Sequence, residues 1–391
     1  MCSSDLLELV KPTDCFDRSA RDLLLAHVDW SRILSDDCPF PLHGAVAANA
    51  KERAAELLKA GADPNAYDSD EYGLTPLHWA AMFNCTDSAQ LLLEVGAQVD
   101  LHYEDYLSPF FVAASTRSEE TALLLLRSGA DPFLDLGVRY TPLECSIYFK
   151  MNDLFAELIQ RGADLNVCSR GSYTALRAAL VSDNIEAARA LIAAGASTQT
   201  PDGDFSVGPL HFAAAEGNLQ GIELLLASGA EVNELSGDGM TALHYASSSK
   251  AEGAVQLLLD KGADPKLKDE YGVTPLLYAV SSRSIECARL LLDAGSDVAA
   301  TEEYGRNALH IAATLGDHEL CQLLIEAGVA VSIGDVKGLT PLHRAAQAGA
   351  GEVVELLLQN GASIWTEDAN GLTAWDHAKG LPPELLGRLK P

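Results

Sequence analysis

The side chains of this sequence that could perform acid–base or metal chemistry do not form a recognised motif. His318 and Cys321 stand three residues apart, and Asp376 directly precedes His377. A zinc site needs three or four protein ligands, so neither pair is sufficient by itself. The patterns typical of phosphate-binding loops, dinucleotide-binding folds, zinc proteases and serine hydrolases are absent from the sequence. We therefore expect no catalytic site, no metal and no cofactor.

Histidine instead recurs at one place in a repeated tetrapeptide that resembles TPLH. It is found at His43, His78, His211, His244, His310 and His343. Successive copies of the tetrapeptide start 33 residues apart, with a single interval of 34, at Thr75, Ser108, Thr141, Thr174, Gly208, Thr241, Thr274, Asn307, Thr340 and Thr373. The glycine of an LLxxGA element recurs in phase with it, from Gly61 to Gly361. Two markers in phase indicate an internal repeat.

Each repeat is expected to consist of two short helices and a turn. Thr75 is suited to cap a helix N-terminus, and Pro76 fits the first helical position. Leucines at 91–93 give the second helix an apolar face, and Gly96 suits its left-handed C-terminal cap. One such unit cannot bury its apolar face alone, so neighbouring units must stack into a solenoid.

The elements DxxGxTPLHxAAxxG and LLLxxGAxxN resemble those of ankyrin repeats, over residues 39–380. The resemblance implies an all-α repeat solenoid of about ten to eleven helix-turn-helix units, from which β-hairpin-like turns project. It implies that hairpin tips and first helices share a concave side. It also implies that the recurring histidine is structural and hydrogen-bonds the turns between repeats. Asparagines that can be hydroxylated in this family match Asn65, Asn166 and Asn233.

The chain is expected to have three parts. Residues 1–38 lack the repeat and are predicted to form an N-terminal helical cap, or a separate docking element. Residues 39–367 are predicted to hold ten repeats, and residues 368–391 a truncated C-terminal capping repeat.

Two sets of aromatic residues are expected in the core. One position of the first helix holds a large residue in several repeats and is interpreted as an apolar packing position: Trp79, Tyr245, Tyr278 and Ile311. Trp375 is predicted to lie in the core of the final cap.

Composition restricts the class of partner. The formal net charge of −29 repels phosphate backbones and anionic lipid, so nucleic acid and membrane surfaces are excluded as preferred partners. A protein with a basic segment is favoured, and the charge could alternatively serve only to keep a monomer soluble. The eight cysteines show no C-x-x-C spacing, and the N-terminus has no apolar leader. These features predict a monomer with reduced thiols in the cytoplasm or nucleus.

The predicted partner-binding residues belong to hairpin tips, to the row after the turn glycine, to the ends of first helices, and to an aromatic segment at 102–150. They are Glu71, Tyr72, Leu74, Met82, Phe83, Glu104, Asp105, Tyr140, Tyr148, Phe149, Tyr173, Phe205, Glu270, Tyr271, Glu303, Tyr304 and Arg306. Aromatic residues are effective anchors in protein interfaces, and acids steer basic partners. Alternatively, single tyrosines of this set could pack on the adjacent hairpin.

We interpret the chain as a non-catalytic scaffold or adaptor that binds a partner peptide or domain in an acidic, aromatic-bearing concave groove. One alternative is an inhibitor or spacer that occludes a partner's active site. Another is an enzyme with a site in the irregular repeats at 102–200, where Glu144, Arg139 and Arg170 are the candidates. The sequence does not identify the partner or the pathway.

Overall fold

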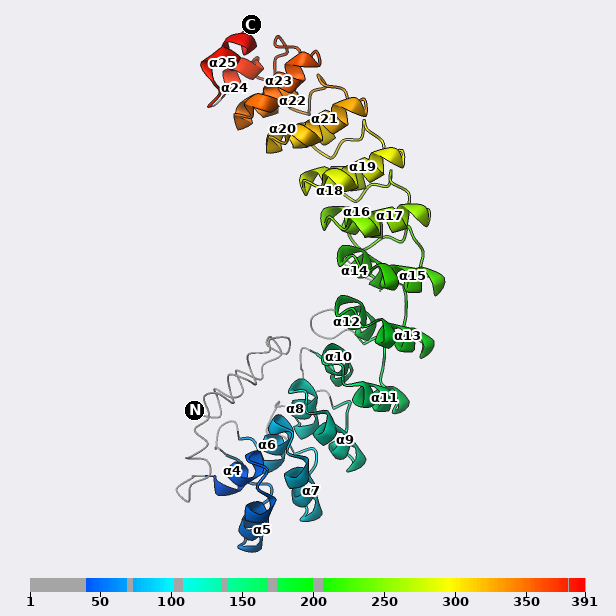
Figure 1. Ribbon diagram of the computed structural model, residues 1–391, viewed down its shortest axis with the longest axis vertical. Coiled ribbons are helices and arrows are strands. Elements are labelled where there is room, and N and C mark those ends of the chain that lie inside the picture. Colours follow the sequence, from blue (N-terminus) through cyan, green and yellow to red (C-terminus); the bar gives the residue numbers. More distant parts are fainter. Residues whose placement is uncertain are drawn as a thin grey trace. The chain divides into compact units, whose positions relative to one another are not determined.

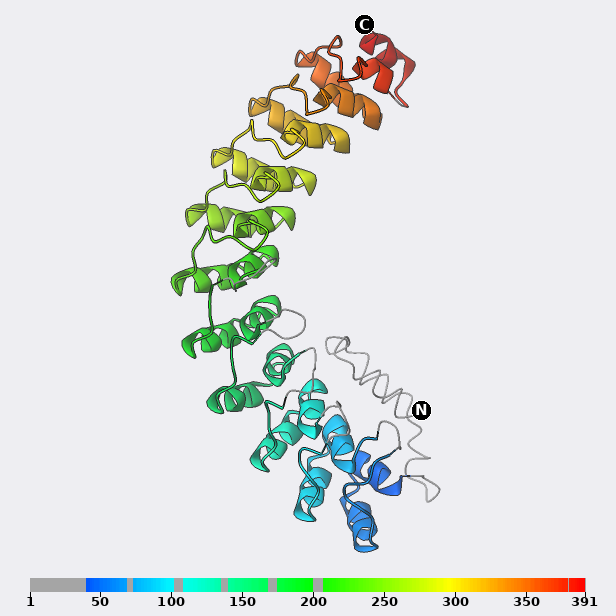
Figure 2. The same cartoon turned by 180° about the vertical axis from the view of Figure 1, so that it is seen from behind.

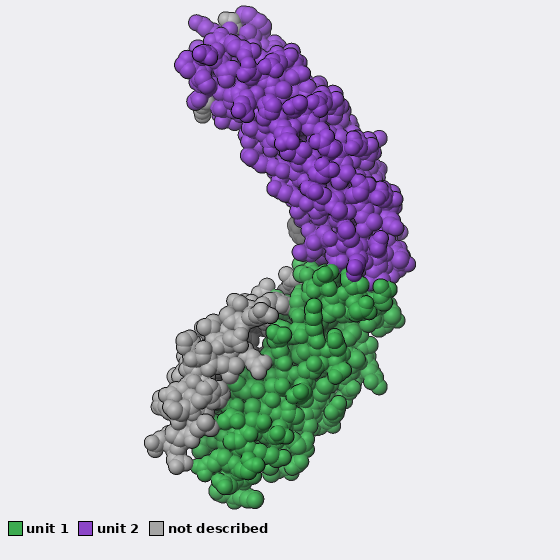
Figure 3. Space-filling view, viewed as in Figure 1, with its two compact units in different colours: residues 1–197 green, residues 198–391 purple. Residues whose placement is uncertain are grey.

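A computed structural model of the chain describes residues 40–68, 73–101, 108–134, 140–167, 174–199, 207–378 and 380–390. Within these ranges every regular element is an α-helix, and the helices follow one another in pairs. The chain is therefore an all-α repeat solenoid, as predicted. It divides into two compact units, unit 1 at residues 1–197 and unit 2 at residues 198–391, which Figure 3 shows in green and purple. The predicted cap at 1–38 lies outside the described residues.

Unit 1 stacks its helix pairs in chain order (Figure 1). The pairs are α4 (Pro41–Ala47) with α5 (Lys51–Lys59), α6 (Pro76–Phe83) with α7 (Thr86–Glu94), α8 (Pro109–Ser115) with α9 (Glu119–Arg127), α10 (Pro142–Tyr148) with α11 (Asn152–Gln160), and α12 (Ala175–Val181) with α13 (Ile185–Ala193).

Unit 2 continues the pattern, and its order can be followed from behind in Figure 2. The pairs are α14 (Pro209–Ala215) with α15 (Leu219–Ala227), α16 (Ala242–Ser248) with α17 (Glu252–Asp260), α18 (Pro275–Ser281) with α19 (Ile285–Asp293), α20 (Ala308–Leu315) with α21 (His318–Glu326), α22 (Pro341–Ala348) with α23 (Gly351–Gln359), and α24 (Ala374–His377) with α25 (Pro383–Leu389).

Small residues on the first helices let neighbouring pairs of unit 2 pack closely. Each first helix contacts the first helix of the next pair and its own second helix. Alanines at the contact are fully buried, at Ala213, Ala246, Ala279, Ala312 and Ala345. One leucine of each second helix is also fully buried, at Leu225, Leu258, Leu291, Leu324 and Leu357. The core of unit 2 is therefore a continuous apolar layer between the two rows of helices.

Trp375 is an exception to this core and corrects a prediction. It occupies the position that Leu342 fills in the preceding pair, where the side chain is fully buried. In the final pair the indole is 41% exposed. The prediction of a core residue was wrong because the short α25, which packs on α23 and α24, leaves this face of α24 partly uncovered.

The recurring histidine connects each first helix to the next turn, as the resemblance implied. His244 Nδ1 accepts the backbone N–H of Thr241 at 3.0 Å, and His244 Nε2 donates to the carbonyl of Val273 at 3.1 Å. The carbonyl can only accept, so the proton of the neutral ring lies on Nε2. Equivalent bonds run from His43 to Leu74, from His310 to Leu339 and from His343 to Leu372, whereas His211 bonds to the carbonyl of Glu234, just before the next turn.

The turn glycines let successive turns approach each other. Gly305 has φ +74°, a left-handed conformation that other residues adopt at a cost. A Cβ atom on Gly305 would lie 3.1 Å from the backbone nitrogen of Val336 in the next turn. Glycine is therefore required at Gly305 both by the conformation of its own backbone and by the closeness of the neighbouring turn.

Replacing this glycine should destabilise the array. Gly305→Ala is expected to lower the unfolding free energy by about 2–4 kcal/mol, because left-handed strain and a steric conflict add. Gly262→Ala is the matched control, since Gly262 has φ +88° and nothing within 4 Å of the added Cβ. The control should cost only about 1–2 kcal/mol. Urea unfolding followed by circular dichroism measures both, and equal losses would show that the approach of the next turn is unimportant.

Candidate functional site

Most turns of unit 2 are held by an acid at their first position, while Ser236 has this role in the turn at 236–240. Asp269 Oδ1 accepts the backbone N–H groups of Tyr271 at 2.9 Å and Val273 at 2.8 Å. Asp335 and Asp368 accept two N–H groups of their own turns in the same way. These bonds fix the turn backbone, so the side chains at its tip need take no part in holding it.

The second oxygen of the turn acid receives a side chain from the following first helix. Asp269 Oδ2 accepts from the Tyr278 hydroxyl at 2.8 Å, and in unit 1 Asp68 Oδ2 accepts from Trp79 Nε1 at 2.9 Å. Partial burial, followed by the bond to Asp269, raises the pKa of Tyr278. Arg344 and His377 make the same contact with Asp335 and Asp368.

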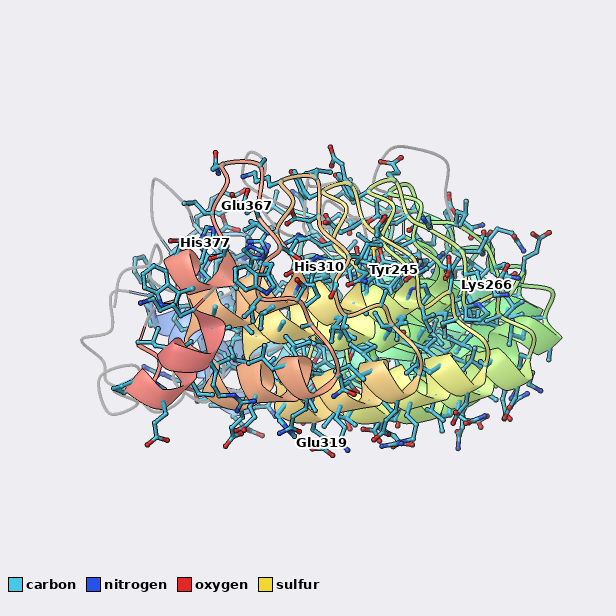
Figure 4. All side chains as sticks on the ribbon, turned by 90° about the horizontal axis from the view of Figure 1, so that it is seen from above. Tyr245, Lys266, His310, Glu319, Glu367 and His377 are labelled. Carbon is cyan, nitrogen blue, oxygen red and sulfur yellow. The ribbon has the colours of Figure 1, made fainter. Side chains whose placement is uncertain are left out.

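The predicted packing position of the first helix is thus only partly apolar. Trp79, Tyr245 and Tyr278 are half-buried, and each ring meets the edge of the histidine of the preceding repeat at 5.4–5.8 Å. Figure 4 shows Tyr245 and His310 between the turns and the helices of unit 2. These rings pack on the histidines, but they are half-buried and do not lie in the core as predicted. The prediction also missed the polar atom that Trp79 and Tyr278 direct to the turn acid.

The turn tips of unit 2 form a continuous row. The N–H of Glu303 donates to the carbonyl of Tyr271 at 3.1 Å, and the N–H of Val336 donates to the carbonyl of Tyr304 at 3.0 Å. The row continues through a bond of 2.9 Å from Ala369 to the carbonyl of Lys337. Because each tip is bonded to the next, side chains at equivalent positions are held at the spacing of the repeats.

This row, which we call the tip row, exposes aromatic and acidic side chains together. It comprises Glu270, Tyr271, Glu303, Tyr304, Val336 and Lys337. Tyr271 is 59% exposed and Tyr304 is 57% exposed, so most of each ring is available to another molecule. Glu270 and Glu303 are also exposed. The structure thus brings together four of the predicted residues on adjacent turns.

Arg306 belongs to the same surface through Tyr304. Its guanidinium carbon lies 5.7 Å from the centre of the Tyr304 ring, and its Nε donates to Glu302 Oε1 at 2.9 Å. The hydrogen bond to Glu302 raises the pKa of Arg306. Partial burial opposes ionisation of Glu302, but the bonds from Arg306 and the turn backbone outweigh it and lower the pKa of this carboxyl. Arg306 is thus held over the ring as a cation.

Val336 is a member of the row that the sequence analysis missed. Its side chain is 66% exposed, more than either tyrosine. Val336 aligns with Glu270 and Glu303 in the repeat, so the alignment could have identified it as a tip residue.

Several predicted residues of unit 1 are buried, which corrects their assignment to a partner surface. Leu74, Met82 and Tyr140 are 3–5% exposed and belong to the core. Leu74 is drawn inward because its N–H bonds to Asp68 and its carbonyl accepts from His43. Tyr140 meets Tyr148 at 6.3 Å in an edge-on pair.

Three other predicted residues of unit 1, at the ends of first helices, keep part of their surface. Phe83, Tyr148 and Phe149 are half-buried, and the Arg117 guanidinium covers Phe149 at 5.4 Å. Glu71, Tyr72, Glu104, Asp105, Tyr173 and Phe205 lie outside the described residues.

The candidate for an enzymatic site has a structural explanation. Glu144 is 1% exposed, and its Oε2 accepts the N–H of Thr141 at 2.6 Å, which completes the capping box of α10. Arg139 and Arg170 lie outside the described residues. In the part of the chain that the structure describes, no three histidine, cysteine or acidic side chains are placed to hold a metal ion. None of the described helices has the length and apolarity needed to cross a membrane.

Comparison with known proteins adds the family context. A family model for ankyrin repeats in three copies matches residues 17–103, 42–135, 210–302 and 294–368, which together cover well over half of the chain.

Three relatives illustrate the likeness. A putative palmitoyltransferase ZDHHC13 of Danio rerio is 30% identical over 53% of this chain, and the match covers 32% of that protein. Rabankyrin-5 of Mus musculus is 31% identical over 51% of the chain and 18% of its own length. The B-cell lymphoma 3 protein homolog of Mus musculus is 30% identical over 40% of the chain and 36% of its own length. The chain thus spans about a third or less of the first two of these relatives.

Proposed function

The chain belongs to the ankyrin-repeat family, and from this premise we propose that it is a non-catalytic scaffold or adaptor whose tip row binds a protein partner. Ankyrin repeats generally mediate protein–protein interactions. The observation that carries the proposal is the exposure of Tyr271 and Tyr304 on adjacent turns. Each turn is already held by its acid and by the next turn, so neither phenol ring has a role in holding the turn. A tyrosine offers a large, rigid contact area and is a frequent anchor in protein interfaces.

Charge supports a basic partner. The chain has a formal charge of −29, and Glu270 and Glu303 flank the tyrosines on the tip row. Acids around aromatic anchors raise the rate of association with a basic segment and disfavour acidic partners. The proposed partner is therefore a protein with a basic segment, which the chain binds as a monomer in the cytoplasm or nucleus.

Affinity capture with matched variants tests this proposal. A variant with Tyr271→Ala and Tyr304→Ala should lose a partner that the unaltered chain retains, with a loss of affinity of about tenfold or more. Raising salt from low to physiological concentration should also weaken capture, because charges steer the association. Trp365→Ala is the control, since Trp365 is 67% exposed in unit 2 but lies outside the tip row.

Other outcomes of the capture would support the alternatives. A partner lost equally by the control, or retained by the tyrosine variant, would contradict binding through the tip row. A partner enzyme whose activity falls on binding would identify the chain as an inhibitor.

A further inference from the structure

Two adjacent turns of unit 2 carry the same Glu-Tyr-Gly sequence but differ in the cation that accompanies the tyrosine. The turns are residues 269–273 and 302–306. In the second turn, Arg306 lies over the Tyr304 ring and is anchored on Glu302. In the first turn the equivalent residue is Val273, which cannot supply a charge. Among the described residues, no cation is placed over the Tyr271 ring, which is 59% exposed.

The carboxylates around Tyr271 are arranged for a cation from outside. Both oxygens of Asp269 are occupied, by the turn backbone and by Tyr278. Glu270 precedes the tyrosine, and Glu303 follows it across the backbone bond of 3.1 Å to the Tyr271 carbonyl. Both glutamates are exposed, and neither is paired with a cation among the described residues. Tyr271 is therefore an exposed aromatic ring with one exposed glutamate beside it on its own turn and another on the next turn.

We propose that Tyr271, Glu270 and Glu303 bind an arginine side chain of the protein partner. The proposal rests on the proposed function and specifies the partner's chemistry. The chain itself contains such an arrangement. The guanidinium of Arg306 lies over the ring of the tip tyrosine Tyr304 and donates to the carboxylate of Glu302. A planar guanidinium can stack on a ring while it donates several hydrogen bonds, whereas a lysine ammonium is a strongly hydrated point charge. Arginine is therefore preferred over lysine.

The spacing of the turns indicates which peptides to use. Neighbouring repeats pack at the separation of adjacent helices, about 8–10 Å. An extended chain advances about 3.3 Å per residue, so its side chains match this separation at every third residue. The probes are three fluorescein-labelled glycine peptides, each with two test residues separated by two glycines. The test residues are arginine, lysine and uncharged citrulline.

Fluorescence anisotropy with the full chain measures the binding of each peptide. The arginine peptide is expected to bind at least about fivefold more tightly than the lysine peptide, and the citrulline peptide to bind weakest. Tyr271→Ala should remove the preference for arginine over lysine, while Tyr271→Phe should keep it because the ring face remains. A variant with Glu270→Gln and Glu303→Gln should weaken binding by about tenfold.

Two further variants separate a specific subsite from general electrostatics. Glu223→Gln with Glu319→Gln removes the same charge from exposed positions on the second helices, and Figure 4 shows Glu319 on the side away from the turns. This control should leave the arginine preference unchanged. Arg306→Val uncovers the Tyr304 ring, and should strengthen binding of the two-arginine peptide severalfold more than that of the two-lysine peptide.

The proposal would be overturned by equal binding of arginine and lysine peptides that Tyr271→Ala does not alter. It would also be overturned if no arginine peptide bound. In either case a captured partner that is still lost by the double tyrosine variant would leave the proposed function standing. Arginine-specific peptide binding without any captured partner would support the arginine subsite and contradict the proposed function.

Discussion

Lowering the pH from about 7.5 to about 5.5 is expected to destabilise the array steeply, by up to about 1.4 kcal/mol per pH unit for each buried histidine. Burial lowers the pKa of the recurring rings, although the bonds to the next turn's carbonyl oppose it, at His43, His211, His244, His310 and His343. The stability that the neutral histidine rings contribute is fully present above the pKa of histidine in the unfolded chain, about 6.5. It is lost as the pH falls from there towards the lowered pKa of the folded state. Unit 2 contains four of these rings, so its unfolding free energy should fall by up to about 5 kcal/mol per pH unit.

The geometry explains why the charged ring is disfavoured. Nε2 already donates to a carbonyl, and Nδ1 accepts the N–H of the helix cap, as in His244. A proton added to Nδ1 would remove this acceptor and place two donors face to face. The turn carboxylates at Glu302, Asp335 and Asp368 also have lowered pKa values, so they too lose stability as the pH falls, but only in the more acidic range where carboxyl groups titrate. The interval from about pH 7.5 to 5.5 therefore reports the histidines.

Urea unfolding of the full chain at several pH values measures this slope. His310→Gln should reduce the slope by about 1.4 kcal/mol per pH unit, because an amide oxygen can still accept the cap N–H but does not titrate. The chain itself tolerates a non-titrating residue at this position, since Leu277 occupies it in the preceding repeat. An unfolding free energy that stays constant over the interval would contradict the assignment of neutral buried rings.

Leu258→Asp should cause the second large effect, a loss of more than about 4 kcal/mol, because it buries an unpaired charge in a fully buried position. The loss should begin locally, since α17 contacts α15 and α19 on either side. In a repeat array each unit depends on its neighbours, so opening is expected to spread outward from the altered pair. Hydrogen exchange read by mass spectrometry should show protection lost first in α15–α19.

Gln256→Asp provides the control for this substitution. Gln256 is exposed on the same helix, so the new charge remains in water and should cost less than about 1 kcal/mol. A uniform loss of protection in all helix pairs of the Leu258→Asp variant would contradict the local account and would indicate that the array unfolds as one body.

The repeat and its helices were predictable because every unit repeats the same caps and apolar positions. The exposure of Tyr271 and Tyr304 also followed from the alignment, since a tip side chain before the turn glycine points away from the stack. The inward position of Leu74 did not follow from the alignment. The residue after the glycine is held by the turn's first side chain, through Asp68 in one turn and Ser236 in another. These hydrogen bonds depend on how one repeat packs on the next. They cannot be predicted from the spacing of residues within a single repeat.

The Arg306–Tyr304 contact was unpredictable for a related reason. Both residues were assigned to the partner surface, but the pairing depends on Glu302, which holds the guanidinium over the ring. A sequence shows which charged and aromatic residues are present, but it does not show which of them contact one another. The difference between Tyr304 and Tyr271 is therefore visible only in the structure.

Photo-crosslinking tests the central claim, that the tip row contacts the partner, most directly. p-Benzoylphenylalanine would replace Tyr271, Tyr304 or Glu319, one at a time, in the full chain. The account predicts that positions 271 and 304 crosslink to the captured protein, while position 319, on the side away from the turns, does not. Equal crosslinking at position 319, or a captured partner that crosslinks at neither tyrosine position, would contradict binding through the tip row.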